Sequence, residues 1–330
     1  MTIRSALDRR TFMRLAGSSV AVGAATLGGT TAASAAPAAS AAPAGQGRRL
    51  VPPGKLGIQL YSIRDKVSSL GFRAVFERLA ELGYAEVEFA GYTQNQVGPI
   101  TPAEIRTLLD DNGLVAVGSH RGIRDFAANM EAELDIAETL GMRHVGTADA
   151  PTNDRTVDGY RAAAEQFNGF GEAAAARGLK FYQHNHDGEF GFAEDDPSVR
   201  LYDVFLEHTD PASVFLEMDV YWAFVGQHRY PGFEPVEYVL ANRSRYPLFH
   251  LKDGRTNPDS AGGYDMVEFG VGDIDYQAFL GALTGSGRQH GIWEQDNAAS
   301  VAEPPHELDS LGNAGRSADA LLALRGGRCG

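Results

Sequence analysis

Residues 177–190 read RGLKFYQHNHDGEF, with Gly178 near the start, then an apolar segment and then a cluster of polar side chains. Gly178 is typical of a helix end, and residues 180–185 are expected to form a short strand. Alternate side chains of a strand share one face, so Tyr182, His184 and His186 would project together. Two imidazoles at one strand end indicate a metal or proton-transfer site, with a hydrogen-bonded structural pair as the alternative.

The same order of helix, glycine, apolar residue and short strand recurs along the chain. The glycines Gly83, Gly113, Gly141 and Gly178 precede strands expected at 86–89, 115–119, 144–146 and 180–185. Their intervals of 30, 28 and 37 residues have the length of a βα unit. Further strands are expected at 56–61, 214–219, 248–252 and 291–295. Eight strands alternating with helices predict an α/β protein with a closed (β/α)8 barrel, the TIM barrel. A doubly wound open sheet is the alternative, disfavoured because no glycine-rich phosphate loop follows the first strand.

The N-terminal residues have the order of a twin-arginine export signal. Residues 8–14, DRRTFMR, supply paired arginines, an Ala/Gly-rich apolar segment follows at 15–27, and the small residues 33–35 form a cleavage site. The apolar segment is too short and too rich in glycine to predict a membrane anchor. We expect a signal peptide at 1–35, an Ala/Pro/Gly linker at 36–54 and a barrel at 55–330. Transport by the twin-arginine machinery and a secreted or extracytoplasmic location follow from this organisation.

The chain is acidic and contains a single cysteine, Cys329. Its formal net charge of −14 would become −17 without residues 1–35, which hold four arginines and one aspartate. Such a charge disfavours nucleic acid as a partner and repels phosphorylated ligands at long range. One cysteine cannot form an intramolecular disulfide, which is compatible with export after folding in the cytoplasm.

Polar residues end the last four expected barrel strands, where the chemistry of this fold is located. These residues are His184 with His186, then Asp219, His250 and Glu294. Nitrogen and oxygen donors at four consecutive strand ends are difficult to explain by local hydrogen bonds alone. Imidazoles and carboxylates without a thiolate suit Mn²⁺, Co²⁺, Mg²⁺ or Zn²⁺. We therefore predict a divalent metal site formed by His184 or His186 together with Asp219, His250 and Glu294, with a structural polar cluster as the alternative interpretation.

An ordered set of motifs covers nearly the whole chain after Leu56. It consists of GIQLYS (57–62), EVE (86–88), HNHD (184–187), EMDVYW (217–222), HLKD (250–253), GDID (272–275) and EQD (294–296). With these motifs the sequence resembles the sugar phosphate isomerase/epimerase family of the xylose isomerase-like barrel superfamily. The resemblance implies a single divalent metal ion held by one residue from each of strands five to eight. Asp219, His250 and Glu294 match three of these positions, whereas the epimerases have a glutamate where this chain has His184.

This metal chemistry implies proton abstraction next to a carbonyl, through an enediolate. Reprotonation gives isomerisation or epimerisation, and loss of a leaving group from the same intermediate gives dehydration or glycoside elimination. Glu294 is the candidate for one proton-transfer residue, and His184 or His186 for the other.

Four further residues are candidates for substrate binding, each with a structural alternative. Lys252 would neutralise an oxygen of the reaction intermediate, or form a salt bridge with Asp253. His120 would bind a substrate hydroxyl or have a structural role, and Glu88 would contact the substrate or form a salt bridge with a helix. Trp222 would stack on a sugar ring, or only pack against neighbouring side chains. Residues 254–272 are long enough to form a lid.

The predicted function is that of a metal-dependent isomerase or epimerase acting on an unphosphorylated sugar or keto-sugar, because phosphorylated sugars are cytoplasmic metabolites. A dehydratase or keto-glycoside lyase with the same metal site is the first alternative. A secreted sugar-binding protein without activity is the second. A DNA-repair nuclease is disfavoured by the acidic charge.

Overall fold

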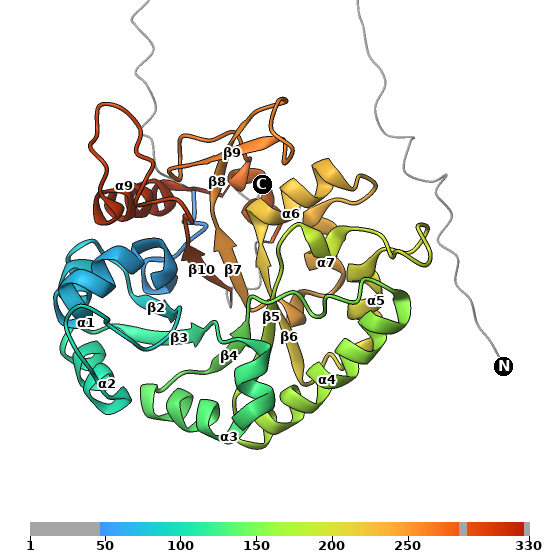
Figure 1. Ribbon diagram of the computed structural model, residues 1–330. Helices are drawn as coiled ribbons and strands as arrows, with labels where there is room; N and C mark the ends of the chain where they lie inside the picture. Colours follow the sequence, from blue (N-terminus) through green and yellow to red (C-terminus); the bar gives the residue numbers. More distant parts are fainter. Residues whose placement is uncertain (1–46, 284–288, 327–330) are drawn as a thin grey trace, which may run out of the picture. The chain divides into compact units, whose positions relative to one another are not determined.

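The computed structural model describes residues 47–283 and 289–326. The expected twin-arginine signal at 1–35 lies outside these residues, as does the expected linker up to residue 46. Within the described part, eight parallel strands form one sheet in the order β3-β2-β1-β10-β7-β6-β5-β4 (Figure 1). They are β1 (Leu56–Gln59), β2 (Glu86–Phe89), β3 (Val115–Ser119), β4 (His144–Thr147), β5 (Lys180–His184), β6 (Val214–Asp219), β7 (Leu248–Leu251) and β10 (His290–Trp293). All eight lie where the sequence predicts them, with ends that differ by at most two residues.

The sheet curls so that its outermost strands, β3 and β4, come together. A single parallel bridge joins His120 to Gly146 across this last gap, and the N–H of Arg121 donates to the carbonyl of Gly146 at 2.8 Å. The predicted (β/α)8 barrel is therefore confirmed in a nearly closed form, and the open doubly wound sheet is not observed.

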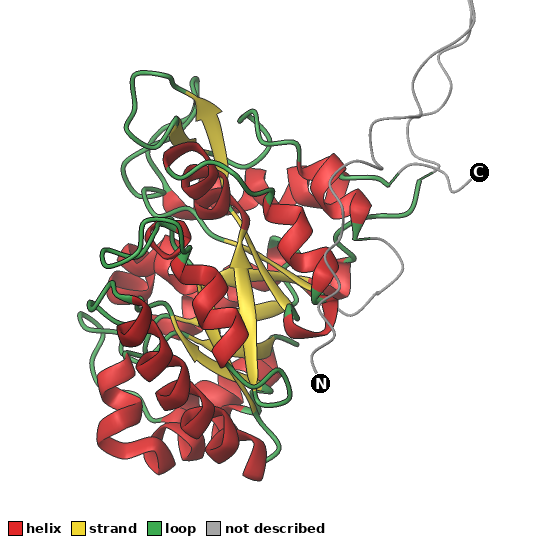
Figure 2. Ribbon diagram, turned by 90° about the vertical axis from the view of Figure 1, so that its right-hand side faces the viewer, coloured by secondary structure: helices red, strands yellow, loops and turns green. Residues whose placement is uncertain are grey.

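Helices follow most strands and surround the sheet, as Figures 1 and 2 show. They are α1 (Arg64–Glu81), α2 (Pro102–Asp111), α3 (Ile123–Leu140), α4 (Val157–Ala176), α5 (Leu201–His208), α6 (Val220–Arg229), α7 (Pro235–Ala241), α8 (Tyr276–Ala282) and α9 (Ser310–Ala323). Helix α2 begins with a capping box in which Thr101 accepts the N–H of Glu104 and the Glu104 carboxylate accepts the N–H of Thr101. The four predicted helix-ending glycines, 83, 113, 141 and 178, have φ between +65° and +86°.

The interior of the barrel alternates between polar and apolar layers. Val117, Tyr182, Leu248 and Ile292 form a small apolar cluster inside the strands. The larger apolar core packs the outer faces of the strands against the helices. Gly146 makes room for the tyrosine, because a Cβ atom there would lie 2.4 Å from the Tyr182 carbonyl oxygen and 2.6 Å from its ring. The apolar layer separates the polar residues of the two barrel ends and supports those at the C-terminal mouth.

The folded domain begins earlier than the predicted boundary at residue 55. Arg49 pairs with Arg325 in an antiparallel bridge, the N–H of Leu50 donates to the carbonyl of Leu324 at 3.2 Å, and Val51 is buried. The last residues of the expected linker therefore belong to the barrel, because they bury apolar surface and pair with the chain after α9.

Residues 254–272 contain an ordered hairpin, in which β8 (Asp253–Thr256) pairs antiparallel with β9 (Tyr264–Val267). The Asp253 carboxylate accepts the backbone N–H groups of Gly254, Gly270 and Gly272 and so fixes the base of the hairpin. Movement of this segment as a lid stays a prediction.

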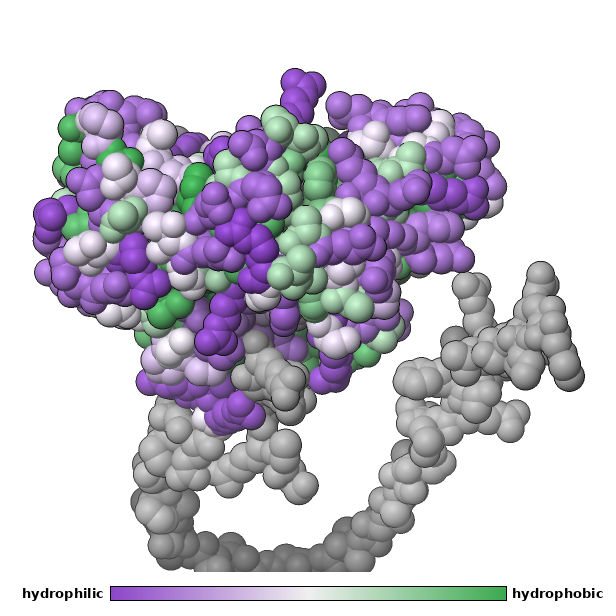
Figure 3. Space-filling view, turned by 90° about the horizontal axis from the view of Figure 1, so that it is seen from below, coloured by the Kyte–Doolittle hydropathy of each residue, from purple (hydrophilic) through white to green (hydrophobic). Residues whose placement is uncertain are grey.

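The surface visible in Figure 3 is mostly hydrophilic, with hydrophobic residues in small scattered areas. Among the described helices, none combines the length and the apolar character that crossing a bilayer requires.

Candidate active site

The four predicted metal ligands meet at the C-terminal mouth of the barrel. His184 ends β5, Asp219 ends β6, His250 lies in β7, and Glu294 follows directly after β10. One donor atom from each side chain lies within 4.8 Å of the others, and all four residues are buried. Neighbouring parallel strands thus deliver two imidazoles and two carboxylates to one point, as the spacing of the strands predicts.

Asp219 is held in place through its backbone and one carboxylate oxygen. Its N–H donates to Oδ1 of Asn185 at 3.1 Å, and Nδ2 of Asn185 donates to its carbonyl at 3.2 Å. Oδ1 of Asp219 accepts the N–H of Trp222 at 2.9 Å and so caps α6. Oδ2 is buried without a hydrogen-bond partner among the described residues and lies 3.6 Å from Nε2 of His184. One oxygen of Asp219 thus remains directed at the other donors.

Lys252 is the buried cation of the site. Its Nζ lies 3.1 Å from Oδ2 of Asp219, 2.8 Å from Oε2 of Glu294 and 2.8 Å from Oδ1 of Asp296. Burial opposes the charge on Lys252, but these carboxylates outweigh it and raise its pKa well above the usual range. The salt bridge considered for Lys252 therefore forms with these three residues, whereas Asp253 binds backbone N–H groups.

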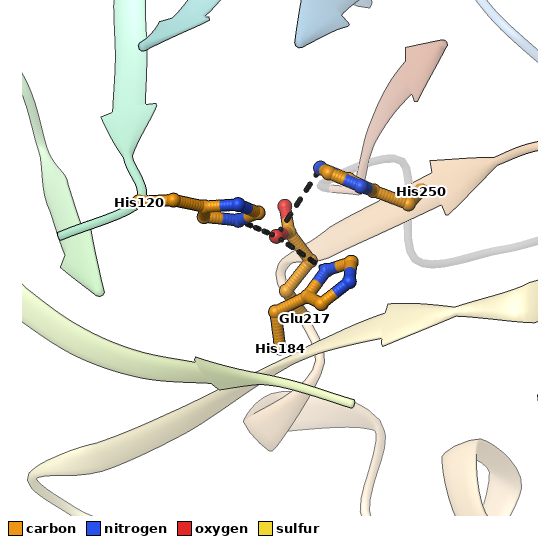
Figure 4. A group of neighbouring side chains, drawn as sticks. All are labelled: His120, His184, Glu217 and His250. Carbon is orange, nitrogen blue, oxygen red and sulfur yellow. Dashed lines mark hydrogen bonds and ion pairs between the residues drawn. The ribbon is translucent and has the colours of Figure 1, made fainter. Parts of the chain in front are cut away.

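A second carboxylate layer lies below the four donors. In Figure 4, the Glu217 carboxylate lies between three imidazoles, with Oε2 at 2.8 Å from Nε2 of His120, 3.1 Å from Nδ1 of His184 and 3.2 Å from Nε2 of His250. These four residues form a second group whose donor atoms lie within 4.8 Å of one another. Glu217 was not among the predicted site residues, although strand alternation places it on the same face as Asp219.

Glu88 belongs to this lower layer and has no solvent exposure. Its Oε2 accepts from Nε2 of Gln59 at 2.8 Å and lies 2.6 Å from Nε2 of His250, while Oε1 accepts from the hydroxyl of Tyr182. Glu88 does not line the cavity, and its described contacts include a short one with His250. None of its described contacts is a salt bridge with a helix residue, and its contact with substrate stays a prediction.

Burial and neighbouring charges shift the pKa values of the acidic and basic side chains of the site in different directions. Burial raises the pKa of Asp219 to about 6, because Lys252 and His250 only partly offset the loss of water. For Glu88, burial is outweighed by His120 and His250, which lower the pKa to about 2. Burial and Lys252 lower the pKa of His186 to about 4, so its ring is neutral near pH 7.

A cavity of about 340 Å³ opens onto these groups. It is lined by Tyr61, Ala90, His120, Ala148, His184, His186, Lys252, Glu294 and Asp296. Five of the predicted site residues therefore face it. Trp222 does not line it but lies behind His186, with the two ring centres 5.7 Å apart.

Tyr61 and Asp296 also line the cavity, although the sequence did not predict them as site residues. Tyr61 is 44% exposed at the rim, with the Arg64 guanidinium 3.9 Å from its ring centre. Asp296 follows Glu294 by two residues after the end of β10, and this spacing in the sequence was the available signal. A larger surface groove of about 480 Å³ beside α1 and α2 contains none of the residues of this cluster.

Comparisons with known proteins agree with this architecture. The profile of the family described as "Xylose isomerase-like TIM barrel" matches residues 76–314, more than half of the chain. No curated protein matches the chain.

Solved structures share the fold at low sequence identity. A sugar phosphate isomerase/epimerase from Parabacteroides distasonis is 24% identical, with a TM-score of 0.66, and the match covers 82% of this chain and 94% of that one. A second protein of that description from the same organism is 22% identical, with a TM-score of 0.64 and coverage of 80% and 96%. An L-ribulose 3-epimerase is 15% identical, with a TM-score of 0.57 and coverage of 82% and 94%.

Proposed function

Because the chain belongs to the xylose isomerase-like TIM barrel family, we propose that it is an enzyme that isomerises or epimerises a sugar with the help of one divalent metal ion. The observation that carries this proposal is the convergence of donor atoms from His184, Asp219, His250 and Glu294 beside a cavity. Mixed imidazole and carboxylate donors suit Mn²⁺, Co²⁺, Mg²⁺ or Zn²⁺.

The buried charges of the site support a cation among these donors. Five carboxylates lie in the cluster, from Glu88, Glu217, Asp219, Glu294 and Asp296, with Lys252 as the permanent cation beside them. Buried carboxylates without compensating charge are costly. Oδ2 of Asp219, which accepts no hydrogen bond among the described residues and has Nζ of Lys252 3.1 Å away, is the oxygen that a metal ion would bind. A bound divalent ion would act as a Lewis acid that polarises a substrate carbonyl.

We assign proton transfer to Glu294 and His186, which line the cavity and follow the ends of different strands, β10 and β5. Burial raises the pKa of Glu294, but Lys252 and His250 outweigh this effect and hold it below the usual range, so the group is an ionised carboxylate. The ring of His186 contacts the rings of His184 and Trp222. As a neutral imidazole, it can accept a proton from a carbon next to a carbonyl and return it. His184 lies deeper and serves as a ligand, so we assign the imidazole role in proton transfer to His186.

We propose an unphosphorylated sugar or keto-sugar as the substrate. Among the described residues that line the cavity, Lys252 is the one lysine or arginine, and three carboxylates already surround it. A phosphate group would therefore meet negative charge without a free cation to bind it. His120 and Asp296 offer polar atoms for sugar hydroxyls, and Tyr61 offers an aromatic ring at the rim.

A dehydratase or keto-glycoside lyase is the second candidate, favoured by one observation. Strand β5 brings His184 and His186 to the mouth, so the site does not present one carboxylate from β5 and another from β10 on opposite sides of a sugar. A secreted sugar-binding protein without activity is the candidate from another class.

One experiment separates these functions. The purified protein is analysed for bound metal and then incubated with unphosphorylated keto-sugars, aldoses and glycosides in D₂O, with and without added Mn²⁺ or Co²⁺. An isomerase or epimerase can return a deuterium-labelled isomer, whereas a lyase or dehydratase gives a smaller product. Turnover of phosphorylated sugars alone would contradict the proposed substrate class, and sugar binding without turnover would favour the binding protein.

We also propose export by the twin-arginine machinery, which the paired arginines, the apolar segment and the small-residue cleavage site support. A chain that carries both Arg9→Lys and Arg10→Lys is expected to remain in the cytoplasm in cell fractionation. Equal export of this variant and the unchanged chain would contradict the proposal.

A further inference from the structure

Two histidines of the site each present both ring nitrogens to acidic side chains. Nε2 of His184 lies 3.6 Å from Oδ2 of Asp219, while its Nδ1 lies 3.1 Å from Oε2 of Glu217. Nδ1 of His250 lies 2.6 Å from Oε2 of Glu294, while its Nε2 lies 2.6 Å from Oε2 of Glu88. Each ring therefore spans two layers, an upper one at the cavity and a lower one beneath it.

The chemistry of imidazole allows only one of these layers to hold a metal ion. A neutral imidazole has one lone pair for a metal and one N–H, which must be donated elsewhere. The two groups of donors, His184, Asp219, His250 and Glu294 above and His120, His184, Glu217 and His250 below, share both histidines. Filling both groups would require both nitrogens of both rings as ligands, so they are alternatives.

Hydrogen bonding favours the upper group. Each group has one unshared member that lines the cavity, Glu294 above and His120 below, while the carboxylates Glu217 and Glu88 are fully buried and do not line it. Glu88 already accepts from Tyr182 and Gln59, and its distance to Nε2 of His250 is that of a strong charge-assisted hydrogen bond. Oε2 of Glu217 lies within hydrogen-bond distance of Nε2 of His120 and Nδ1 of His184, as Figure 4 shows, and an ionised carboxylate can only accept a hydrogen bond from these nitrogens.

We propose that Glu217 and Glu88 are positioning residues that fix the tautomers of the two histidine ligands. Glu217 holds the proton on Nδ1 of His184, which leaves Nε2 for the metal ion. Glu88 holds the proton on Nε2 of His250, which leaves Nδ1. This inference rests on the proposed metal-dependent function and adds to it the ligating nitrogen of each histidine and the carboxylate that selects it.

Metal affinity tests the two carboxylates directly. Binding of Co²⁺ to the metal-free protein is measured by calorimetry and by the Co²⁺ absorption bands for the wild type, Glu217→Gln and Glu88→Gln. Loss of either carboxylate is expected to weaken Co²⁺ binding about 10- to 100-fold. Glu86→Gln is the matched control, because Glu86 is another buried glutamate of β2 that contacts a histidine, His290, at 2.7 Å outside this cluster. The control is expected to bind Co²⁺ like the wild type, and Glu88→Asp is expected to retain more affinity than Glu88→Gln.

The outcomes distinguish this inference from the function on which it rests. Absence of Co²⁺ binding by the wild type would overturn the metal-dependent function. Binding by the wild type and by both glutamine variants within about threefold would leave that function in place and overturn the positioning role.

Nuclear magnetic resonance of the Zn²⁺-loaded wild type provides a test that needs no variant. Long-range correlations in protein labelled with ¹⁵N-histidine are expected to show metal at Nε2 of His184 and Nδ1 of His250. The reverse pattern, with metal at Nδ1 of His184 and Nε2 of His250, would assign the ion to the lower group and overturn the proposal.

Discussion

Nδ1 of His250 lies 2.6 Å from Oε2 of Glu294, although 44 residues separate the two in the sequence. Their strands, β7 and β10, are parallel neighbours, and His250 is paired in register with Ile292. Both side chains therefore emerge at the same mouth of the barrel, where Lys252 also contacts Glu294. The barrel thus brings a ligand candidate and a proton-transfer candidate into direct contact before any cation is added.

Replacement of Glu294 by glutamine is the most direct test of activity. Glu294→Gln keeps the shape of the side chain but removes its charge and its ability to take up a proton, so turnover is expected to fall at least about 100-fold. Steady-state rates with the sugar found by the D₂O screen provide the measurement. Glu172→Gln, on the exposed face of α4, is the control and should retain full activity. Unchanged turnover by Glu294→Gln would exclude the role assigned to this carboxylate.

Removal of the buried lysine is expected to destabilise the metal-free protein. Lys252→Met leaves Asp219, Glu294 and Asp296 without their cation, and loss of one partner from a buried ion pair costs about 3–5 kcal/mol. Added Mn²⁺ should restore part of the free energy of unfolding, because the ion binds the folded state. Lys66→Met is the control, because Lys66 forms a partly exposed ion pair with Asp309, with 2.9 Å between the charged atoms. This substitution should lower the free energy of unfolding by less than about 1 kcal/mol. Urea unfolding with and without Mn²⁺ measures both variants, and equal stability of Lys252→Met and the wild type in EDTA would contradict the expectation.

The fold could be predicted from the sequence because the patterns that indicate it lie within short segments of the chain. A glycine such as Gly113 or Gly178 is needed at φ near +70°, and the apolar strand that follows each helix starts within a few residues of it. Alternation along each strand then placed His184, Asp219, His250 and Glu294 on inward faces. Neither inference requires knowledge of how distant strands align across the barrel.

The lower layer could not be predicted in the same way. Glu217 meets His120 across 97 residues, and the contact depends on the register of β6 and on the closure between β3 and β4. Strand alternation shows that Glu217 points inward but not which side chains it meets. The contacts of Glu88 with His250 and Tyr182 could not be predicted for the same reason, because they join residues that are far apart in the sequence.

The pH dependence of stability provides a prediction outside the ligand set. Burial raises the pKa of Glu189 to about 7, where its carboxyl group lies 3.2 Å from the N–H of His186 and 3.4 Å from Nε2 of Gln183. The pKa of a glutamate in the unfolded chain is 4.5, so between this pH and about pH 7 the folded state binds more protons than the unfolded state does. Stability is therefore lost as pH rises through this window, by up to about 3 kcal/mol.

Glu189→Gln should remove this loss, because the amide does not ionise. The free energy of unfolding is measured in urea at about pH 5 and about pH 8. The wild type and Glu207→Gln, an exposed change on α5, should both lose stability at the higher pH, whereas Glu189→Gln should lose less. An equal loss in all three proteins would contradict the raised pKa of Glu189 in the folded state.

The same substitution at two glycines should change stability in opposite directions. Gly146 lies in β4, where an added Cβ would be 2.4 Å from the carbonyl oxygen of Tyr182 and 2.6 Å from its ring. Gly146→Ala should therefore cost at least about 2 kcal/mol and weaken Co²⁺ binding, since Tyr182 donates to Glu88 beneath His250. Gly169 lies inside α4 with no atom within 4 Å of an added Cβ, so Gly169→Ala should stabilise the protein by about 0.5–1 kcal/mol. Urea unfolding and Co²⁺ titration measure both effects. Gly146→Ala with wild-type stability would mean that Tyr182 can move aside, and hence that the apolar layer does not fix the carboxylates above it.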